Sequence, residues 1–152
     1  MDTLAAGDPA PEISAPNQHG DPVSPDFEAP TVLYFYPRDG TPGCTTEAAQ
    51  FEREADAYAD AGVTVYGVST DSVESHREFA DEQDLSFELL ADPDGEVADA
   101  FGVERSSSDA AARTTFVLVD GRVERVYDGV DPDGHARDVL AALLEDGVVT
   151  LE

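Results

Sequence analysis

Residues 31–51, TVLYFYPRDGTPGCTTEAAQF, join a hydrophobic run to a short turn and then to a periodic segment. Residues 31–36 are mostly apolar and aromatic, which is typical of a strand buried on both faces of a sheet. Glycine and proline mark the turn that follows. Apolar residues then recur every three or four positions between 45 and 59, and Gly62 follows as a stop, which predicts an amphipathic helix. The stretch is therefore a strand-to-helix turn, with Cys44 directly before the predicted helix.

Cys44, the only cysteine of the chain, is interpreted as a reactive thiol. The first turn of a helix presents unpaired N–H groups and the positive end of the helix dipole, and both favour a thiolate. The alternative is a buried structural cysteine, because a free cysteine packs as a small hydrophobic residue. Since its neighbours are glycine, proline and threonine rather than an apolar stripe, we expect an exposed and reactive thiol.

Length and composition favour one globular domain. The chain has 152 residues, of which 41% are hydrophobic, and this is enough for a core that needs neither disulfides nor a structural metal. We therefore expect a single domain over residues 1–152. Residues 1–8 lack the basic and apolar regions of a secretory signal, so a cytoplasmic location is expected.

The charge of the chain is strongly negative. Eight arginines, with no lysine, stand against 34 aspartates and glutamates, which gives a net charge of −26. Such a surface repels nucleic-acid phosphates and anionic lipids, so neither nucleic acid nor membrane is expected as a partner. The acidic residues are spread between apolar segments, and salt at about 1 M would screen most of their repulsion. The composition is typical of a cytoplasmic protein from a halophile.

The rest of the chain alternates strands and helices. A loose N-terminal hairpin is expected around Ile13 and Val23, and Asp120-Gly121 is typical of a turn between antiparallel strands. A mobile loop is expected over 104–112. The other predicted elements are strands over 63–68, 87–90, 114–119 and 122–127, and helices from an N-cap at 71 or 72, over 96–101 and over 136–144. This order predicts an α/β, thioredoxin-like fold with an N-terminal extension and a central mixed β-sheet flanked by helices.

Pro37, Thr41 and Cys44 form the pattern P-x-x-x-T-x-x-C, which resembles the motif around the peroxidatic cysteine of the peroxiredoxins. Glu47 also matches that family. The bacterioferritin-comigratory or Q-type branch is the more similar one, and the resemblance covers nearly the whole chain. Its motifs are FYP at 35–37, TPGCTTEA at 41–48, LADPDG at 90–95 and RTTF at 113–116.

The resemblance implies a thiol-dependent peroxidase that reduces hydrogen peroxide or organic hydroperoxides. Cys44 would attack one peroxide oxygen and become a sulfenic acid. Thr41 would hold the peroxide through its hydroxyl, although a threonine there also suits a helix N-cap. Arg113 would stabilise the thiolate and the developing negative charge, the alternative being an ordinary surface arginine.

The remaining site residues shape the pocket in this resemblance. Glu47 would orient Arg113, or would simply complement the helix dipole. Pro37 would shield the thiolate, and the backbone N–H groups of Gly43 and Cys44 would complete the peroxide-binding site.

One position departs from the Q-type pattern. Many members carry a resolving cysteine five residues after the peroxidatic one, and Ala49 stands there in this chain. The resemblance therefore implies a one-cysteine mechanism in which an external thiol resolves the sulfenic acid, whether a small thiol, a glutaredoxin or a thioredoxin. The oligomeric state, monomer or homodimer, stays open.

Cofactors and metals are not expected. His19, His76 and His135 lie far apart in the sequence and show no metal-ligand spacing. Two other functions use the same cysteine: a thiol–disulfide oxidoreductase, which would need a second cysteine where Glu47 stands, and a redox-sensing module without catalysis.

Overall fold

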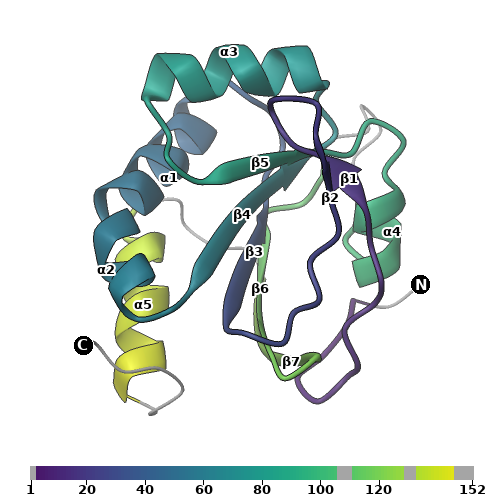
Figure 1. Cartoon of the computed structure of the whole chain (residues 1–152), viewed down its shortest axis with the longest axis vertical. Helices are drawn as coiled ribbons and strands as arrows, with labels where there is room; N and C mark the ends of the chain where they lie inside the picture. The colour runs from purple at the N-terminus through teal and green to yellow at the C-terminus, as the bar shows by residue number, and fades with distance from the viewer. Residues whose placement is uncertain (1–2, 106–110, 129–132, 146–152) are drawn as a thin grey trace.

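A five-stranded mixed sheet forms the centre of the computed structural model, which describes residues 3–105, 111–128 and 133–145 (Figure 1). The strand order is β5-β4-β3-β6-β7. The central strand, β3, runs parallel to β4 and antiparallel to β6. The bounds of the strands are Thr31–Phe35 for β3, Thr64–Ser69 for β4, Glu88–Ala91 for β5, Thr114–Val119 for β6 and Arg122–Asp128 for β7.

Helices cover both faces of this sheet (Figure 1). Helices α1, α2 and α5 gather on one side, and α4 lies on the other side with the N-terminal segment. That segment contains a short antiparallel pair, β1 (Ala15–Pro16) and β2 (Pro22–Val23). The helices are α1 (Pro42–Arg53), α2 (Ala55–Asp60), α3 (Val73–Gln83), α4 (Glu96–Phe101) and α5 (His135–Glu145).

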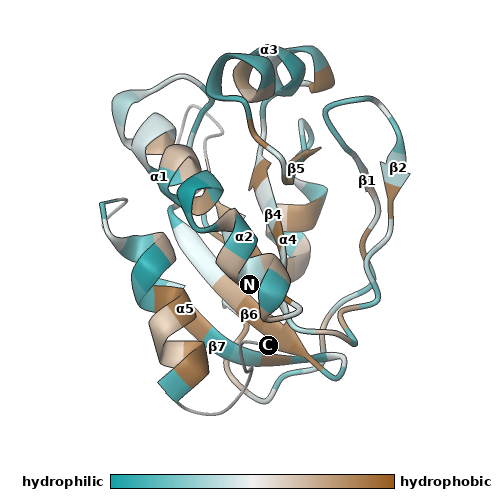
Figure 2. Ribbon diagram, turned by 60° about the vertical axis from the view of Figure 1, so that its left-hand side comes forward, coloured by the Kyte–Doolittle hydropathy of each residue, from teal (hydrophilic) through white to brown (hydrophobic). Residues whose placement is uncertain are grey.

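The sheet separates two hydrophobic cores, and β3 contributes to both. Its alternating side chains point to opposite faces: Val32 and Tyr34 pack with α1 and α5, whereas Leu33 and Phe35 pack with α4. All five residues of β3 are buried, as the apolar run predicts. Figure 2 shows the hydrophobic residues on the strands and the hydrophilic residues on the outer side of α3.

The predicted fold class is confirmed, with one change at the segment after the turn. The helix expected over 45–59 begins earlier, at Pro42, and is divided into α1 and α2 at Glu54. Proline suits the first position of a helix because it lacks the N–H that would be unpaired there. The early start places Cys44 inside the first turn of α1 rather than before it.

The other elements agree with the sequence to within a few residues. Ser72 is the N-cap of α3, and its side chain accepts a hydrogen bond from Ser75 N–H. Most of the loop expected over 104–112 lies outside the described residues, and Arg105 and Ala111 form a bridge at its ends. None of the helices in the described ranges is long and apolar enough to cross a lipid bilayer.

Candidate active site

The turn between β3 and α1 places Cys44 at the start of a helix. The first helical hydrogen bond runs from Thr45 N–H to Thr41 O, at 2.9 Å. The N–H groups of Gly43 and Cys44 therefore lie before the hydrogen-bonded ladder, where a helix presents donors to an anion. Pro42 contributes no N–H, so the donors at this end come from the residues nearest the sulfur.

The sulfur of Cys44 is buried, so the expectation of an exposed thiol is wrong. Cys44 is 1% exposed and belongs to the same hydrophobic cluster as Ala48 and Phe51, which are also buried on α1. Since these residues are spaced by four and three positions, one face of α1 turns all three side chains toward the sheet. Pro37 and Gly40 lie in the loop, whereas Pro42 and Gly43 already belong to the first turn of α1, whose buried residues include Cys44.

Arg113 contacts both Cys44 and Glu47. Its Nη2 donates to Cys44 Sγ at 3.4 Å, and its Nη1 donates to Glu47 Oε1 at 2.6 Å. The Arg113 side chain is 16% exposed and that of Glu47 is 0% exposed. The short bond to a buried carboxylate fixes the guanidinium, because a charge-assisted bond of this kind is stronger than a neutral one.

Burial and ion pairing shift the pKa values of Glu47 and Arg113 in opposite directions. Burial raises the pKa of Glu47 from 4.5 to about 7, although the Arg113 guanidinium lowers it. Burial alone would lower the pKa of Arg113, but Glu47 and Cys44 raise it above its ordinary value. Arg113 therefore stays a cation beside the sulfur, and Glu47 changes its protonation state near neutral pH.

Glu47 lies in the second turn of α1, and the first turn carries no acidic residue. This position disfavours the alternative in which Glu47 only complements the helix dipole, because that effect fades beyond the first turn. Its second oxygen, Oε2, is buried and has no hydrogen-bond partner among the described residues. The ion pair with Arg113 is therefore the interaction that holds this carboxylate in the core.

Thr41 and Pro37 lie in the loop that precedes the helix. Thr41 is the N-cap of α1, but its side chain makes no capping hydrogen bond and its hydroxyl instead donates to Arg38 O at 3.1 Å. Thr41 therefore occupies the N-cap position that the alternative predicted, but its hydroxyl does not cap the helix. Pro37 is half-buried directly after Tyr36. The structure thus brings Cys44, Glu47 and Arg113 together, with Thr41 at the start of the same helix.

Other arginines near in sequence lie elsewhere. Arg105 pairs with Asp99 at 3.3 Å, and Arg122 donates to Gly7 O at 3.2 Å. Arg113 reaches the sulfur because β3 and β6 are antiparallel, with Phe35 opposite Thr114. This register places the residue before β6 beside the loop that follows β3.

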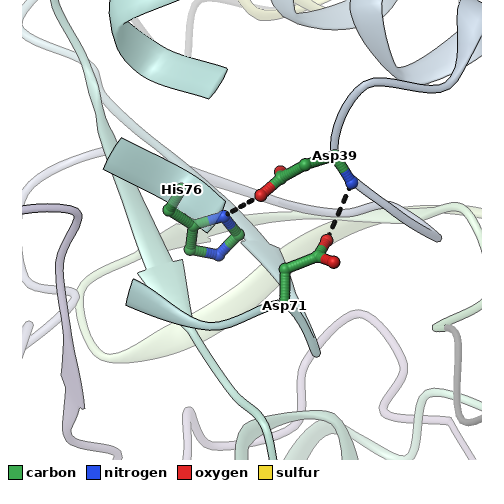
Figure 3. A group of neighbouring side chains, drawn as sticks. All are labelled: Asp39, Asp71 and His76. Atoms are coloured by element: carbon green, nitrogen blue, oxygen red, sulfur yellow. Dashed lines mark hydrogen bonds and ion pairs between the residues drawn. The ribbon is translucent and has the colours of Figure 1, made fainter. Parts of the chain in front are cut away.

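A second cluster, which the sequence did not predict, lies near the cysteine loop. Asp39, Asp71 and His76 lie together, with one possible ligand atom from each within 4.8 Å of the others (Figure 3). One signal was present in the sequence. His76, Phe79 and Ala80 are spaced as one helix face, and all three are buried on α3.

The chemistry of this arrangement is that of a sulfur nucleophile held beside a permanent cation. The guanidinium and the backbone N–H groups of the helix start both stabilise negative charge, whether on the thiolate or on an oxygen that it displaces. The side chain that donates to the sulfur, Arg113, cannot bind a metal ion. Among the described residues, Cys44 does not belong to the group of side chains that could hold one.

Comparison with known proteins gives consistent relatives. Residues 6–126 match the AhpC/TSA family. Peroxiredoxin Bcp of Escherichia coli is 40% identical over 95% of this chain and 99% of its own. The crystal structure of peroxidoxin BcpB from Mycobacterium tuberculosis is 35% identical, with a TM-score of 0.87 over 93% of this chain and 97% of that one. A structure of the Xanthomonas campestris bacterioferritin comigratory protein, described for its alkyl peroxide reduction activity, is 33% identical, with a TM-score of 0.82 over 88% of this chain and 91% of that one.

Proposed function

Because this chain belongs to the AhpC/TSA family, among its Bcp and Q-type peroxiredoxins, we propose that it is a thiol-dependent peroxidase with Cys44 as the reacting group. The observation that carries the proposal is the contact between Arg113 Nη2 and Cys44 Sγ at 3.4 Å. A buried thiol gains nothing structural from a guanidinium, whereas a thiolate that attacks a peroxide is stabilised by it before and during the reaction.

In the first step, the Cys44 thiolate attacks one oxygen of the peroxide. An S–O bond forms and the O–O bond breaks, so the sulfur is oxidised to a sulfenic acid and the peroxide is reduced. The departing hydroxide or alkoxide takes up a proton and leaves as water or an alcohol. Arg113 and the N–H groups of Gly43 and Cys44 stabilise the negative charge on the departing oxygen, while Thr41 and Pro37 border the space in which the peroxide binds.

In the second step, an external thiol reduces the sulfenic acid. Its sulfur attacks Cys44 Sγ, water leaves, and a second thiol then releases the cysteine and a disulfide product. The chain supplies neither thiol, because Cys44 is its only cysteine and Ala49 stands at the Q-type resolving position. A small thiol, a glutaredoxin or a thioredoxin would supply them, and the cytoplasm is the compartment that keeps such thiols reduced.

Hydrogen peroxide and organic hydroperoxides are both proposed substrates. The alkyl peroxide reduction named for the Xanthomonas campestris relative supports the second class. Both share the O–O bond that the thiolate cleaves, and the apolar residues around Cys44 would accept an alkyl group. The chain acts as a monomer or a homodimer in this proposal.

The test is a stopped-flow reaction of reduced protein with stoichiometric hydrogen peroxide in molar salt, followed by trapping of the sulfenic acid and mass spectrometry. Rapid oxidation confined to Cys44 is expected, together with loss of turnover in Cys44→Ser. Oxidation no faster than that of a free thiol would reject catalysis and leave the redox-sensing alternative.

A further inference from the structure

A buried hydrogen-bond network holds the loop that carries the site residues. Asp39 lies in the middle of this loop, two residues before Thr41. Its carboxylate accepts hydrogen bonds from the Tyr36 hydroxyl at 2.6 Å and from the Ser75 hydroxyl at 2.8 Å. His76 Nδ1 lies 2.7 Å from Asp39 Oδ2, the oxygen that also accepts from Ser75 (Figure 3).

Both ring nitrogens of His76 have partners in the interior. The ring is 0% exposed and the Asp39 side chain is 6% exposed. Nε2 lies 3.0 Å from Leu90 O, which can only accept, so this nitrogen carries a proton. Nδ1 faces a carboxylate that also accepts from two hydroxyls. His76 therefore joins the Asp39 carboxylate to the backbone of β5 in the interior.

The loop backbone is anchored too. Asp39 N–H donates to Asp71 Oδ2 at 2.7 Å (Figure 3). The Ser69 hydroxyl donates to the same oxygen at 2.6 Å. Asp39 is thus tied to the end of β3, to the turn between β4 and α3, and to α3 itself, with β5 joined through His76. Without the His76 ring, the Asp39 carboxylate would lose a partner that lies 2.7 Å away.

We propose that Asp39 and His76 are positioning residues. Their hydrogen bonds form a latch that holds loop 37–41 in the conformation that reacts with peroxide. This inference rests on the proposed peroxidase function. The two residues from Asp39 to Thr41 span at most about 7 Å, so a displacement of Asp39 moves the start of α1. A misplacement of about 1 Å can cost about a hundredfold in rate.

The same latch hinders the second step of the reaction, in which an external thiol reduces the sulfenic acid. Cys44 is 1% exposed, so a thiol reductant reaches its sulfur only after the surrounding loop moves. That movement breaks the bonds at Asp39. Weakening the latch therefore slows the attack on peroxide and speeds the reduction of the sulfenic acid, a pair of opposite effects that simple destabilisation does not produce.

Asp39, Asp71 and His76 also have the donor types of a small divalent-cation site. Their facing atoms, however, are already hydrogen-bonded to one another, with His76 Nδ1 bound to Asp39 and Asp71 Oδ2 bound to the Asp39 backbone. The 2.7 Å separation of His76 Nδ1 and Asp39 Oδ2 is that of a direct hydrogen bond, so the geometry favours the latch.

The experiment compares Asp39→Asn, His76→Gln and the double variant with His19→Gln, which changes an exposed histidine. Stopped flow measures the rate constant with hydrogen peroxide, and a second mixing step measures the reaction of the sulfenic acid with 2-mercaptoethanol. We expect a fall of about tenfold or more in the first rate and a rise of about threefold in the second. The double variant should be no slower with peroxide than the worse single variant, and the control should match the original chain.

Unchanged rates in both single variants, or a parallel fall of both rates, would overturn the latch. If either variant fails to fold, Ser75→Ala replaces it, because this change removes one donor to Asp39 and keeps the contact between Asp39 and His76. Smaller shifts in the same opposite directions are then expected. A melting temperature that Mn²⁺ raises in the original chain but not in His76→Gln would overturn the latch in favour of a metal site. Failure of the original chain to oxidise Cys44 would instead contradict the proposed function.

Discussion

Cys44, Glu47 and Arg113 form a chain of contacts in which each member limits the freedom of the next. Glu47 is held in the core by one short bond to Arg113, at 2.6 Å, and Arg113 reaches the sulfur with its other terminal nitrogen. The planar guanidinium suits this double task because its donors are fixed relative to one another. Substitutions of Arg113 and Glu47 therefore test how these contacts act on the sulfur.

Arg113→Lys keeps a positive charge but removes the fork that contacts Glu47 and Cys44 together. We expect the rate constant for reaction with hydrogen peroxide to fall by about tenfold to a hundredfold. Stopped-flow oxidation measures this rate, and Arg122→Lys, which changes the arginine bound to Gly7 O, is the matched control. Equal rates for Arg113→Lys and the original chain would contradict the proposed role of Arg113.

The raised pKa of Glu47 makes stability depend on pH. The native state holds the Glu47 proton up to about pH 7, whereas the unfolded chain releases it near 4.5. The stabilisation from this proton is complete below pH 4.5 and is lost as the pH rises through 7. Between these values, the free energy of unfolding of the original chain should fall relative to that of Glu47→Gln by up to about 3 kcal/mol.

Urea denaturation of both proteins across this pH range measures the difference, and the other acidic groups cancel because the two chains share them. A difference that stays constant from pH 4.5 to 7 would show that Glu47 titrates normally.

At the scale of elements, β4 passes β3 and β5 closely at Gly67. A Cβ built there would lie 2.8 Å from Leu89 Cδ2 and 2.9 Å from the Tyr34 ring. Tyr34 in turn stacks on Phe51 of α1, with ring centroids 4.5 Å apart. The packing between the central strands and the helix that carries Cys44 therefore requires a glycine at position 67.

Gly67→Ala should destabilise the protein by about 1–3 kcal/mol, because Leu89 and the buried Tyr34 have little room to move. Chemical denaturation gives the free energy of unfolding, and Thr64→Ala, at an exposed position of the same strand, is the control. An unchanged or increased stability of Gly67→Ala would mean that the strands can separate without cost.

At the scale of the whole molecule, the net charge of −26 opposes compaction. Acidic residues lie on outer surfaces such as that of α3, where Glu78, Asp81 and Glu82 are exposed. Their mutual repulsion is long-ranged in dilute buffer and is screened when the Debye length falls to about 3 Å at 1 M salt. The halophilic origin and the single domain over residues 1–152 stay predictions.

The melting temperature should rise as sodium chloride increases from about 0.1 M to molar concentration. Neutralising three acids of α3 with Glu78→Gln, Asp81→Asn and Glu82→Gln should raise the melting temperature at low salt and reduce its dependence on salt. Calorimetry of both proteins over the salt series measures this. A melting temperature indifferent to salt would contradict adaptation to high salt.

The sequence by itself determined the elements and the position of the cysteine. Hydrophobic periodicity, glycine and proline act on residues close in the chain, so the buried strand at 31–36 and the turn before Cys44 could be predicted from their neighbours alone. The same is true of the short helix at 96–101, which the structure reproduces. The choice of Arg113 came from a family resemblance and not from local pattern.

Only the tertiary structure decided what surrounds the sulfur. Arg113 is 69 residues from Cys44 in sequence and reaches it through the register of β3 with β6. Asp39 and His76 are 37 residues apart and meet where α3 packs beside the cysteine loop. The burial of Cys44 likewise depends on which face of α1 meets the sheet. Such contacts follow from the packing of separate elements, which no local stretch of sequence encodes.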